Sequence, residues 1–209
     1  MIFINKNAEP NSLTKHRKTP YSSYDNIPFG TKQEIYLSLL KEQGEICSYC
    51  MGRICGENIN IEHYIPQSES DSEKAMEYNN MLGVCHGNKG KSPKMQTCDT
   101  RRGNKPLCVN PLCRISVGKI KYMDDGTIYS DDTEINNDLN STLNLNYSRL
   151  KSNREKALLA LNAELKSENV AGDWSSLANR YMILLNSSDK KREYCGILLW
   201  YLKKKLKKQ

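Results

Sequence analysis

Apolar residues are sparse and aperiodic over residues 1–30, a stretch that also contains three prolines. We therefore expect an extended arm there, with little structure of its own. Residues 31–34 (Thr-Lys-Gln-Glu) form a capping-box sequence, and Ile35, Leu39 and Leu40 then recur at helical spacing. This pattern predicts a helix that begins near Thr31 and ends at Gly44.

The spacing of apolar residues changes between residues 46 and 65, where apolar and polar positions alternate, most clearly over residues 58–61. Such alternation is typical of short strands. A brief helix is expected around residues 73–78. Further on, the dipeptide Asp125-Gly126 lies between two apolar stretches and predicts a β-hairpin within residues 107–130.

From about residue 143 leucine and alanine recur at helical spacing. The pattern predicts an amphipathic helix over residues 147–166 and two further helices over residues 174–185 and 190–208. Because the composition changes there, we place a domain boundary near residue 140.

The composition limits the class of protein. The chain has 209 residues, of which 38% are hydrophobic, and its mean hydropathy is −0.70. Its longest uninterrupted apolar run is residues 197–202, which is too short to span a membrane. The first residues lack the basic start and long apolar stretch of a signal peptide. We expect a cytoplasmic protein without membrane contact, in which eight cysteines indicate metal ligation before disulfides.

The positive charge is concentrated in two places. Residues 190–209 hold eight Lys and Arg against Glu193 alone, which equals the net charge of +7 for the whole chain. A second basic block, residues 89–121, holds nine Lys and Arg against Asp99. Two local basic surfaces predict a polyanionic partner.

Cys47 and Cys50 form a C-x2-C pair, the spacing with which a turn presents two thiolates to one Zn²⁺. The competing interpretation is a redox dithiol, but the βαβ context of such enzymes is missing here. Two choices remain open for the second pair of zinc ligands: Cys85 with Cys98, or Cys108 with Cys113. His86 is an alternative ligand, and Cys55 and Cys195 are expected to be ordinary residues.

Glu62 and His63 are the most informative residues. A carboxylate directly precedes one of only three histidines, about a dozen residues after the zinc-type pair and at the end of a β-leaning stretch. Near a bend both side chains could serve one site, with Glu62 as metal ligand and His63 as base. The structural alternative is a buried histidine without catalytic work.

The order of these motifs resembles that of HNH endonucleases. It consists of Cys47-x2-Cys50, Glu62-His63-x2-Pro66, Asn80-x-Leu82 and Cys98-Asp99-x2-Arg102. More narrowly, the chain resembles the HNH subunit of Septu-type and retron-associated anti-phage systems, with its Ile2-Phe3-Ile4 start and its split pair of cysteines. The motifs cover about residues 45–113.

The resemblance implies an α+β fold with a ββα-metal core and a structural zinc knuckle, followed by a C-terminal α-helical lobe. The domains would be residues 1–30 (arm), 31–140 (HNH nuclease domain with its zinc site) and 141–209 (helical lobe with a basic tail). Zinc would be held by Cys47, Cys50, Cys85 and Cys98, which would stabilise a fold with little core of its own.

The resemblance also implies catalytic roles. His63 would be the general base, Glu62 would hold Mg²⁺ or Mn²⁺, and Asn80 would brace the loop that carries the base. The remaining metal ligand is open between Asp99, which stands where the family often has His or Asn, and Asn104. Asp99 could instead be a helix cap.

Basic residues beside this site are expected to contact substrate phosphates: Arg101, Arg102, Lys105, Lys89 and Lys91. Phosphate contacts position nucleic acid but specify no sequence. DNA is the default substrate from the wider family, and structured RNA is an alternative.

The implied partners are a nucleic acid substrate, an ATPase of the ABC/SMC type and, in retron versions, a reverse transcriptase with its DNA–RNA product. Two other functions compete with the nuclease. One is a non-catalytic zinc-ribbon adaptor, which needs the thiolates but not Glu62 and His63 together. The other is a thiol oxidoreductase that uses Cys47 and Cys50.

Overall fold

The computed structural model describes residues 1–56, 58–69, 71–168, 173–187 and 189–207. It is a mixed α+β fold with two two-stranded antiparallel sheets. The elements follow in the order α1 Asn11–Arg17, α2 Phe29–Gln43, β1 Asn60–His63, α3 Ser72–Ala75, β2 Met81–Val84, α4 Cys98–Arg102, α5 Arg114–Gly118, β3 Ile120–Tyr122, β4 Ile128–Ser130, α6 Thr133–Asn137, α7 Ser148–Glu168, α8 Trp174–Ser187 and α9 Cys195–Leu206. Short 3₁₀ turns and one π-turn (Asp138–Thr142) connect several of them.

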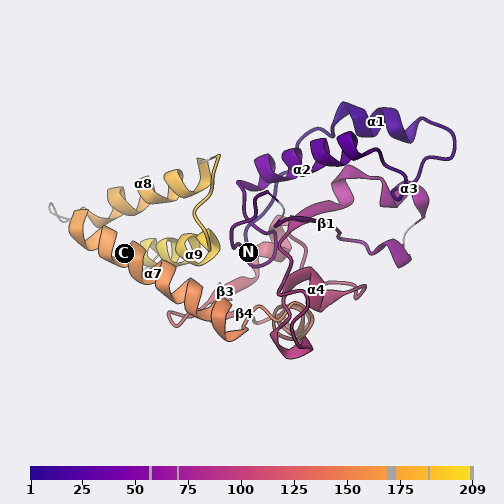
Figure 1. Cartoon of the computed structure of the whole chain (residues 1–209). Helices are drawn as coiled ribbons and strands as arrows, with labels where there is room; N and C mark the ends of the chain where they lie inside the picture. The colour runs from indigo at the N-terminus through magenta and orange to yellow at the C-terminus, as the bar shows by residue number, and fades with distance from the viewer. Residues whose placement is uncertain (57, 70, 169–172, 188, 208–209) are drawn as a thin grey trace.

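The N-terminal region is more ordered than its sequence predicts. Pro10 precedes helix α1, which packs on α2 (Figure 1). Leu13 of α1 is fully buried in a small core that also contains Ile27 and Tyr78. The expectation of an unstructured arm is therefore wrong, because burial against α2 stabilises a helix that has little periodicity of its own.

Helix α2 begins and ends for different reasons. It starts after Pro28, and no side chain caps it. The predicted capping box is therefore wrong: Thr31 is buried inside the helix, and Glu34 instead accepts a hydrogen bond from Ser12 at 2.6 Å. The predicted end is confirmed, because Gly44 has φ of 67° and forms a left-handed cap.

The two hairpins have different connections. β1 pairs with β2 so that Glu62 lies opposite Leu82 and His63 opposite Met81, although 17 residues separate the strands in sequence. The predicted hairpin around Asp125-Gly126 is confirmed as β3 and β4. Gly126 has φ of 82°, and a Cβ at this position would collide with the carbonyl oxygen of Lys151 on α7.

The three C-terminal helices lie together on one side of the molecule (Figure 1). Helices α7 and α8 confirm the predicted segments, whereas α9 begins at Cys195, several residues later than predicted, because Tyr194 adopts a left-handed conformation. Lys208, part of the predicted third helix, lies outside the described residues. Among the described residues, no helix has both the length and the apolar character needed to cross a bilayer.

One hydrophobic core joins the lobe to the rest of the chain. Its buried members run from Met1 to Leu202 and include residues of β2, of both short hairpin strands β3 and β4, and of α7, α8 and α9. The segment before α9 also lies across the turn that carries Cys47 and Cys50. Arg53 donates to the carbonyl of Lys191 at 2.7 Å, and the amide of Tyr194 donates to the carbonyl of Met51 at 2.9 Å. The boundary predicted near residue 140 stays a prediction, and the core is continuous across it.

Candidate metal centre and the adjoining buried site

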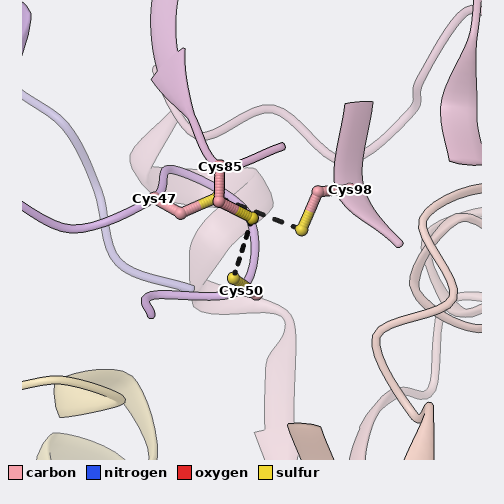
Figure 2. Close-up of side chains that lie close together, drawn as sticks. All are labelled: Cys47, Cys50, Cys85 and Cys98. Atoms are coloured by element: carbon pink, nitrogen blue, oxygen red, sulfur yellow. Dashed lines mark hydrogen bonds between the residues drawn. The ribbon is translucent and has the colours of Figure 1, made fainter. Parts of the chain in front are cut away.

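Four cysteine side chains point toward one another and form one cluster (Figure 2). Cys47 and Cys50 come from the turn that the Ile46–Arg53 bridge closes, Cys85 directly follows β2, and Cys98 begins α4. Cys47, Cys50 and Cys98 are buried, and Cys85 is half-buried. Three segments that are distant in sequence therefore meet at this cluster.

The spacing of the sulfurs matches a tetrahedral zinc site. All four Sγ atoms lie within 4.8 Å of one another; the Cys47–Cys98 pair is 3.9 Å apart and the Cys50–Cys85 pair 3.8 Å. A tetrahedron with Zn–S bonds of about 2.3 Å has S···S edges of about 3.8 Å. A disulfide would need about 2.05 Å. These four thiols could therefore hold one metal ion such as zinc.

The backbone of the first turn is arranged around its sulfurs. The amide of Gly52 donates to Sγ of Cys50 at 3.4 Å, and the amide of Cys47 donates to the carbonyl of Gly52 at 2.9 Å. The hydrogen bonds that Cys50 shares with Cys47 and Cys85, together with burial, raise the pKa of its thiol well above the ordinary value. A divalent cation would supply the charge that lets several of these thiols ionise together.

Of the two candidate second pairs, the structure brings Cys85 and Cys98 together with Cys47 and Cys50. Cys108 is exposed, and its thiol lies 3.8 Å from the carboxylate of Glu134. His86 neighbours Cys85 but is outside the cluster of ligand atoms. Cys55 is exposed and Cys195 is buried apart from the cluster, and both are free thiols.

Glu62 lies at the end of β1 and is 7% exposed. Its Oε1 accepts a hydrogen bond from the hydroxyl of Tyr49 at 3.0 Å and forms an ion pair with Arg102. Tyr49 lies between the two cysteines of the first pair, and Arg102 lies one helical turn after Cys98. Two of the three segments that carry the cysteines therefore also hold Glu62.

The structure corrects the role predicted for Arg102. The side chain is 2% exposed, and every nitrogen of its guanidinium has an acceptor in the protein. Besides Glu62 and the hydroxyl of Tyr49, these acceptors are the carbonyls of His63 (2.9 Å), Tyr64 (2.6 Å) and Lys105 (2.8 Å). A guanidinium that is this deeply buried and bonded at each nitrogen is not exposed to a substrate phosphate, so Arg102 organises the site from within.

His63 is held in one orientation. Its Nε2 lies 2.9 Å from the carbonyl oxygen of Ala75. Because a carbonyl can only accept, Nε2 carries the proton and Nδ1 carries the lone pair. The ring of Tyr24 packs edge-on against the imidazole, with 4.4 Å between the two ring centroids. Burial lowers the pKa of His63, which favours the neutral form with a free lone pair on Nδ1.

Asn80 ties the chain after His63 to the start of β2. Its Oδ1 accepts from the amide of Ile65 at 2.7 Å, and its Nδ2 donates to the carbonyl of the same residue at 3.1 Å. A further, longer bond of 3.4 Å reaches the carbonyl of Lys74. The buried side-chain amide of Asn80 thus bonds to both the N–H and the C=O of Ile65.

Asp99 lies in the first turn of α4, close enough to form a side-chain hydrogen bond with Glu62. Burial first, and then the charge of Asp99, raise the pKa of Glu62 to about 8 despite the attraction of Arg102. With both carboxylates ionised, Arg102 would neutralise only one of the two negative charges, so near neutral pH a proton is retained on Glu62. Asn104 is exposed beyond the end of α4.

Glu62, Asp99 and His63 are neighbours, but their ligand atoms do not converge as closely as the four cysteine sulfurs do. Within the described ranges, the four cysteines are the only group of three or more Cys, His, Asp or Glu whose ligand atoms converge within 4.8 Å. The other predicted phosphate contacts lie at the surface: Lys89, Lys91 and Lys105 are exposed. Arg101 is half-buried, and its guanidinium donates to the carbonyls of Pro93 and Ser141.

Sequence reasoning missed Tyr49 and Tyr24. The signal for Tyr49 was available, because a residue between two metal-binding cysteines is positioned by them. Tyr24 comes from the N-terminal region that was expected to be unstructured, so nothing in its local sequence linked it to His63.

A scan against protein-family models finds no match to this chain, and a search of curated proteins likewise finds none.

Proposed function

We propose that this protein is a metal-dependent endonuclease of the HNH type, with a structural zinc ion at the four cysteines. The observation that carries the proposal is the placement of Glu62, His63 and Asp99. The first two end strand β1, the third lies in the first turn of helix α4, and β2 lies between them in sequence. This strand–strand–helix order is what a ββα-metal nuclease requires, together with a histidine whose Nδ1 has no hydrogen-bond partner in the part of the chain that the structure describes.

His63 is the proposed general base. Its Nδ1 would take a proton from the water that attacks the phosphodiester, while the bond from Nε2 to Ala75 keeps the ring in place. Asn80 acts through the backbone, because it holds the loop that follows the base. It is a positioning residue and does not touch the reacting atoms.

Glu62 and Asp99 are the proposed holders of Mg²⁺ or Mn²⁺. Their carboxyl groups are adjacent, and hard divalent cations prefer oxygen ligands, so the residues fit an ion that takes the place of the proton on Glu62. When bound, the ion would polarise the scissile phosphate and stabilise the leaving oxygen. Arg102 and Tyr49 keep Oε1 of Glu62 in position for this task.

Zinc is the proposed organiser of the site. It would join the turn that carries Tyr49 to the helix that carries Asp99 and Arg102, so that the cation ligands are held from both sides. The basic surface residues Lys89, Lys91, Lys105 and Arg101 are proposed to attract nucleic acid. DNA is the default substrate, and structured RNA is the alternative.

The resemblance to Septu-type and retron-associated subunits supports a role in anti-phage defence in the cytoplasm. There the chain would be the effector of a complex with an ABC/SMC-type ATPase and, in retron versions, a reverse transcriptase and its DNA–RNA product. Co-purification of the chain with the products of its neighbouring genes tests this assignment separately from catalysis.

The test of catalysis is cleavage of plasmid DNA and of total RNA in Mg²⁺ or Mn²⁺, paired with zinc analysis. About one zinc per chain and cleavage that is lost in His63→Ala are expected. His86→Ala is the matched control, because it removes a histidine beside Cys85 that lies outside the cysteine cluster. The assay is repeated on the co-expressed complex, since a partner could control the activity.

The burial of Glu62 and His63 favours one other function, a zinc-binding adaptor in which both residues are structural. A His63→Ala protein separates the two. If it keeps its fold and zinc and also its full biological effect, the adaptor is correct and the nuclease is not.

A further inference from the structure

A groove of about 770 Å³ lies where the N-terminal segment meets the end of α2, α5 and α9. Phe3 and Asn5 line it from the N-terminal segment, and Leu199, Trp200 and Lys203 line it from α9. Neither the four clustered cysteines nor Glu62, His63, Asn80 and Asp99 belong to its lining. It is therefore a separate feature of the surface.

The walls of the groove are positively charged. Four cations line it: Lys41, Arg114, Lys191 and Lys203. Among the described residues, none of the four has a carboxylate partner within 4.0 Å. Of the two acids in the lining, Glu42 is already bound by the ammonium of Lys6 at 2.5 Å and by the amide of Asn7 at 3.0 Å. Only Asp189 remains to oppose four cations.

The groove also offers flat surfaces. The guanidinium of Arg114 lies 3.9 Å from the ring centroid of Phe3, so the two form a stacked pair at one side. Trp200 is half-buried, with its ring centroid 6.2 Å from that of Tyr122. The ammonium of Lys204 lies 4.7 Å from the centroid of Trp200, so a stacked base would take the place of this lysine on the ring. Aromatic rings and guanidinium planes are the surfaces on which nucleic acid bases stack.

We infer that this groove binds single-stranded nucleic acid. Cations without acidic partners would contact successive phosphates, and Trp200 and the Arg114–Phe3 pair would contact bases. Lys203, Lys204 and Lys205 follow Trp200 in α9 and continue the positive charge toward the C-terminal end of that helix. The inference does not depend on the metal site, and it assigns the helical lobe a role in holding a strand.

A single strand fits the chemistry better than a duplex or an acidic peptide. A duplex hides the faces of its bases, so that the aromatic surfaces would have no partner. An acidic peptide would use the cations but not the stacking surfaces. Both are included as competitors in the test.

The first experiment measures fluorescence anisotropy of labelled dT20 and rU20, a 20-base-pair duplex and a poly-glutamate peptide. It uses the full chain with His63→Ala and no added Mg²⁺ or Mn²⁺, so cleavage cannot interfere. The triple variant Lys41→Gln/Arg114→Gln/Lys203→Gln should bind the single strands at least tenfold more weakly. Its slope of log affinity against log salt should fall by about 2, roughly 0.7 for each lost phosphate contact.

The matched control is Lys166→Gln, which removes one exposed lysine at the end of α7, outside the groove. It should leave both affinity and slope unchanged. All substituted positions of the triple variant are exposed, and zinc content with circular dichroism verifies the fold. An unchanged slope in the triple variant, or tighter binding of the duplex or the peptide, overturns the inference. A difference between dT20 and rU20 tells which strand is preferred.

The second experiment tests stacking. Because the chain has only two tryptophans, Trp174→Phe leaves Trp200 as the sole tryptophan reporter. Saturating dT20 or rU20 should quench its fluorescence with the same midpoint as the anisotropy titration. Binding without any change in the Trp200 signal would overturn the assignment to this groove. Loss of groove binding and loss of cleavage are read in different variants, so either can fail without the other.

Discussion

Replacing Arg102 with methionine is expected to be the most damaging single change to the site. Methionine keeps much of the apolar volume of the side chain but removes its charge and its donors. The guanidinium is 2% exposed, pairs with Glu62 and also bonds to Tyr49. It is moreover the donor to three backbone carbonyls. The substitution would leave a buried carboxylate without its cation.

The magnitude follows from breaking this buried pair and from leaving three carbonyls without their donor. Removing one partner of a buried ion pair costs about 3–5 kcal/mol. Whole domains are stable by only about 5–15 kcal/mol. For a chain of this size each 1 kcal/mol lowers the melting temperature by roughly 2–4 °C, so Arg102→Met should lower it by about 6–20 °C.

The assay is thermal and urea-induced unfolding in zinc-containing buffer. Arg101→Met is the matched control, because Arg101 is half-buried and, among the described residues, its guanidinium bonds to the carbonyls of Pro93 and Ser141 and to no carboxylate. Its cost should be about 1 kcal/mol. Adding Glu62→Gln to Arg102→Met should recover part of the loss, since the two residues act on each other. If Arg102→Met costs no more than Arg101→Met, the internal role assigned to Arg102 is wrong.

Three further predictions concern the rest of the site. Because the pKa of Glu62 is raised to about 8, a cation that binds below that pH must displace a proton from its carboxyl group. The affinity for Mn²⁺ or Mg²⁺, measured by calorimetry, should therefore rise about tenfold per pH unit up to pH 8 and then level off. A flat profile contradicts the assignment of Glu62 as a metal ligand. Asn80→Ala should lower the cleavage rate while zinc content stays near one per chain and stability falls by about 1–3 kcal/mol, whereas an unchanged rate removes its positioning role. Cys50→Ser should reduce zinc content and, with it, thermal stability; full zinc content in this variant would exclude the four-cysteine site.

The sequence predicted the clustered cysteines better than the structure around them. The C-x2-C spacing of Cys47 and Cys50 lets one local turn present both thiolates to the same ion, so the pair could be recognised without tertiary information. Cys85 and Cys98 could not be chosen over Cys108 and Cys113 from spacing alone. Their selection depends on where β2 ends and α4 begins, which is a tertiary property.

Burial was the other property hidden from the sequence. Arg102 stands beside Arg101 in a basic block, and nothing local shows that one turns inward and the other outward. The predicted basic tail has the same difficulty. Lys203, Lys204 and Lys205 belong to helix α9, whose Ile197, Leu198 and Leu202 are in the main core, so deleting residues 190–209 would remove part of the core as well as charge. Side-chain substitution is therefore the better probe of that surface.

The way α9 and the segment before it lie across the cysteine turn has a consequence for folding. Arg53 and Lys191 are 138 positions apart, so their contact requires the closure of a long loop. During synthesis at about 5–20 residues per second, Cys98 is made roughly 5–20 s before the residues of α9. All four thiols are thus present in the growing chain before the helix that covers them. Metal loading at that stage would close the shorter loops first and give α9 a formed surface on which to dock.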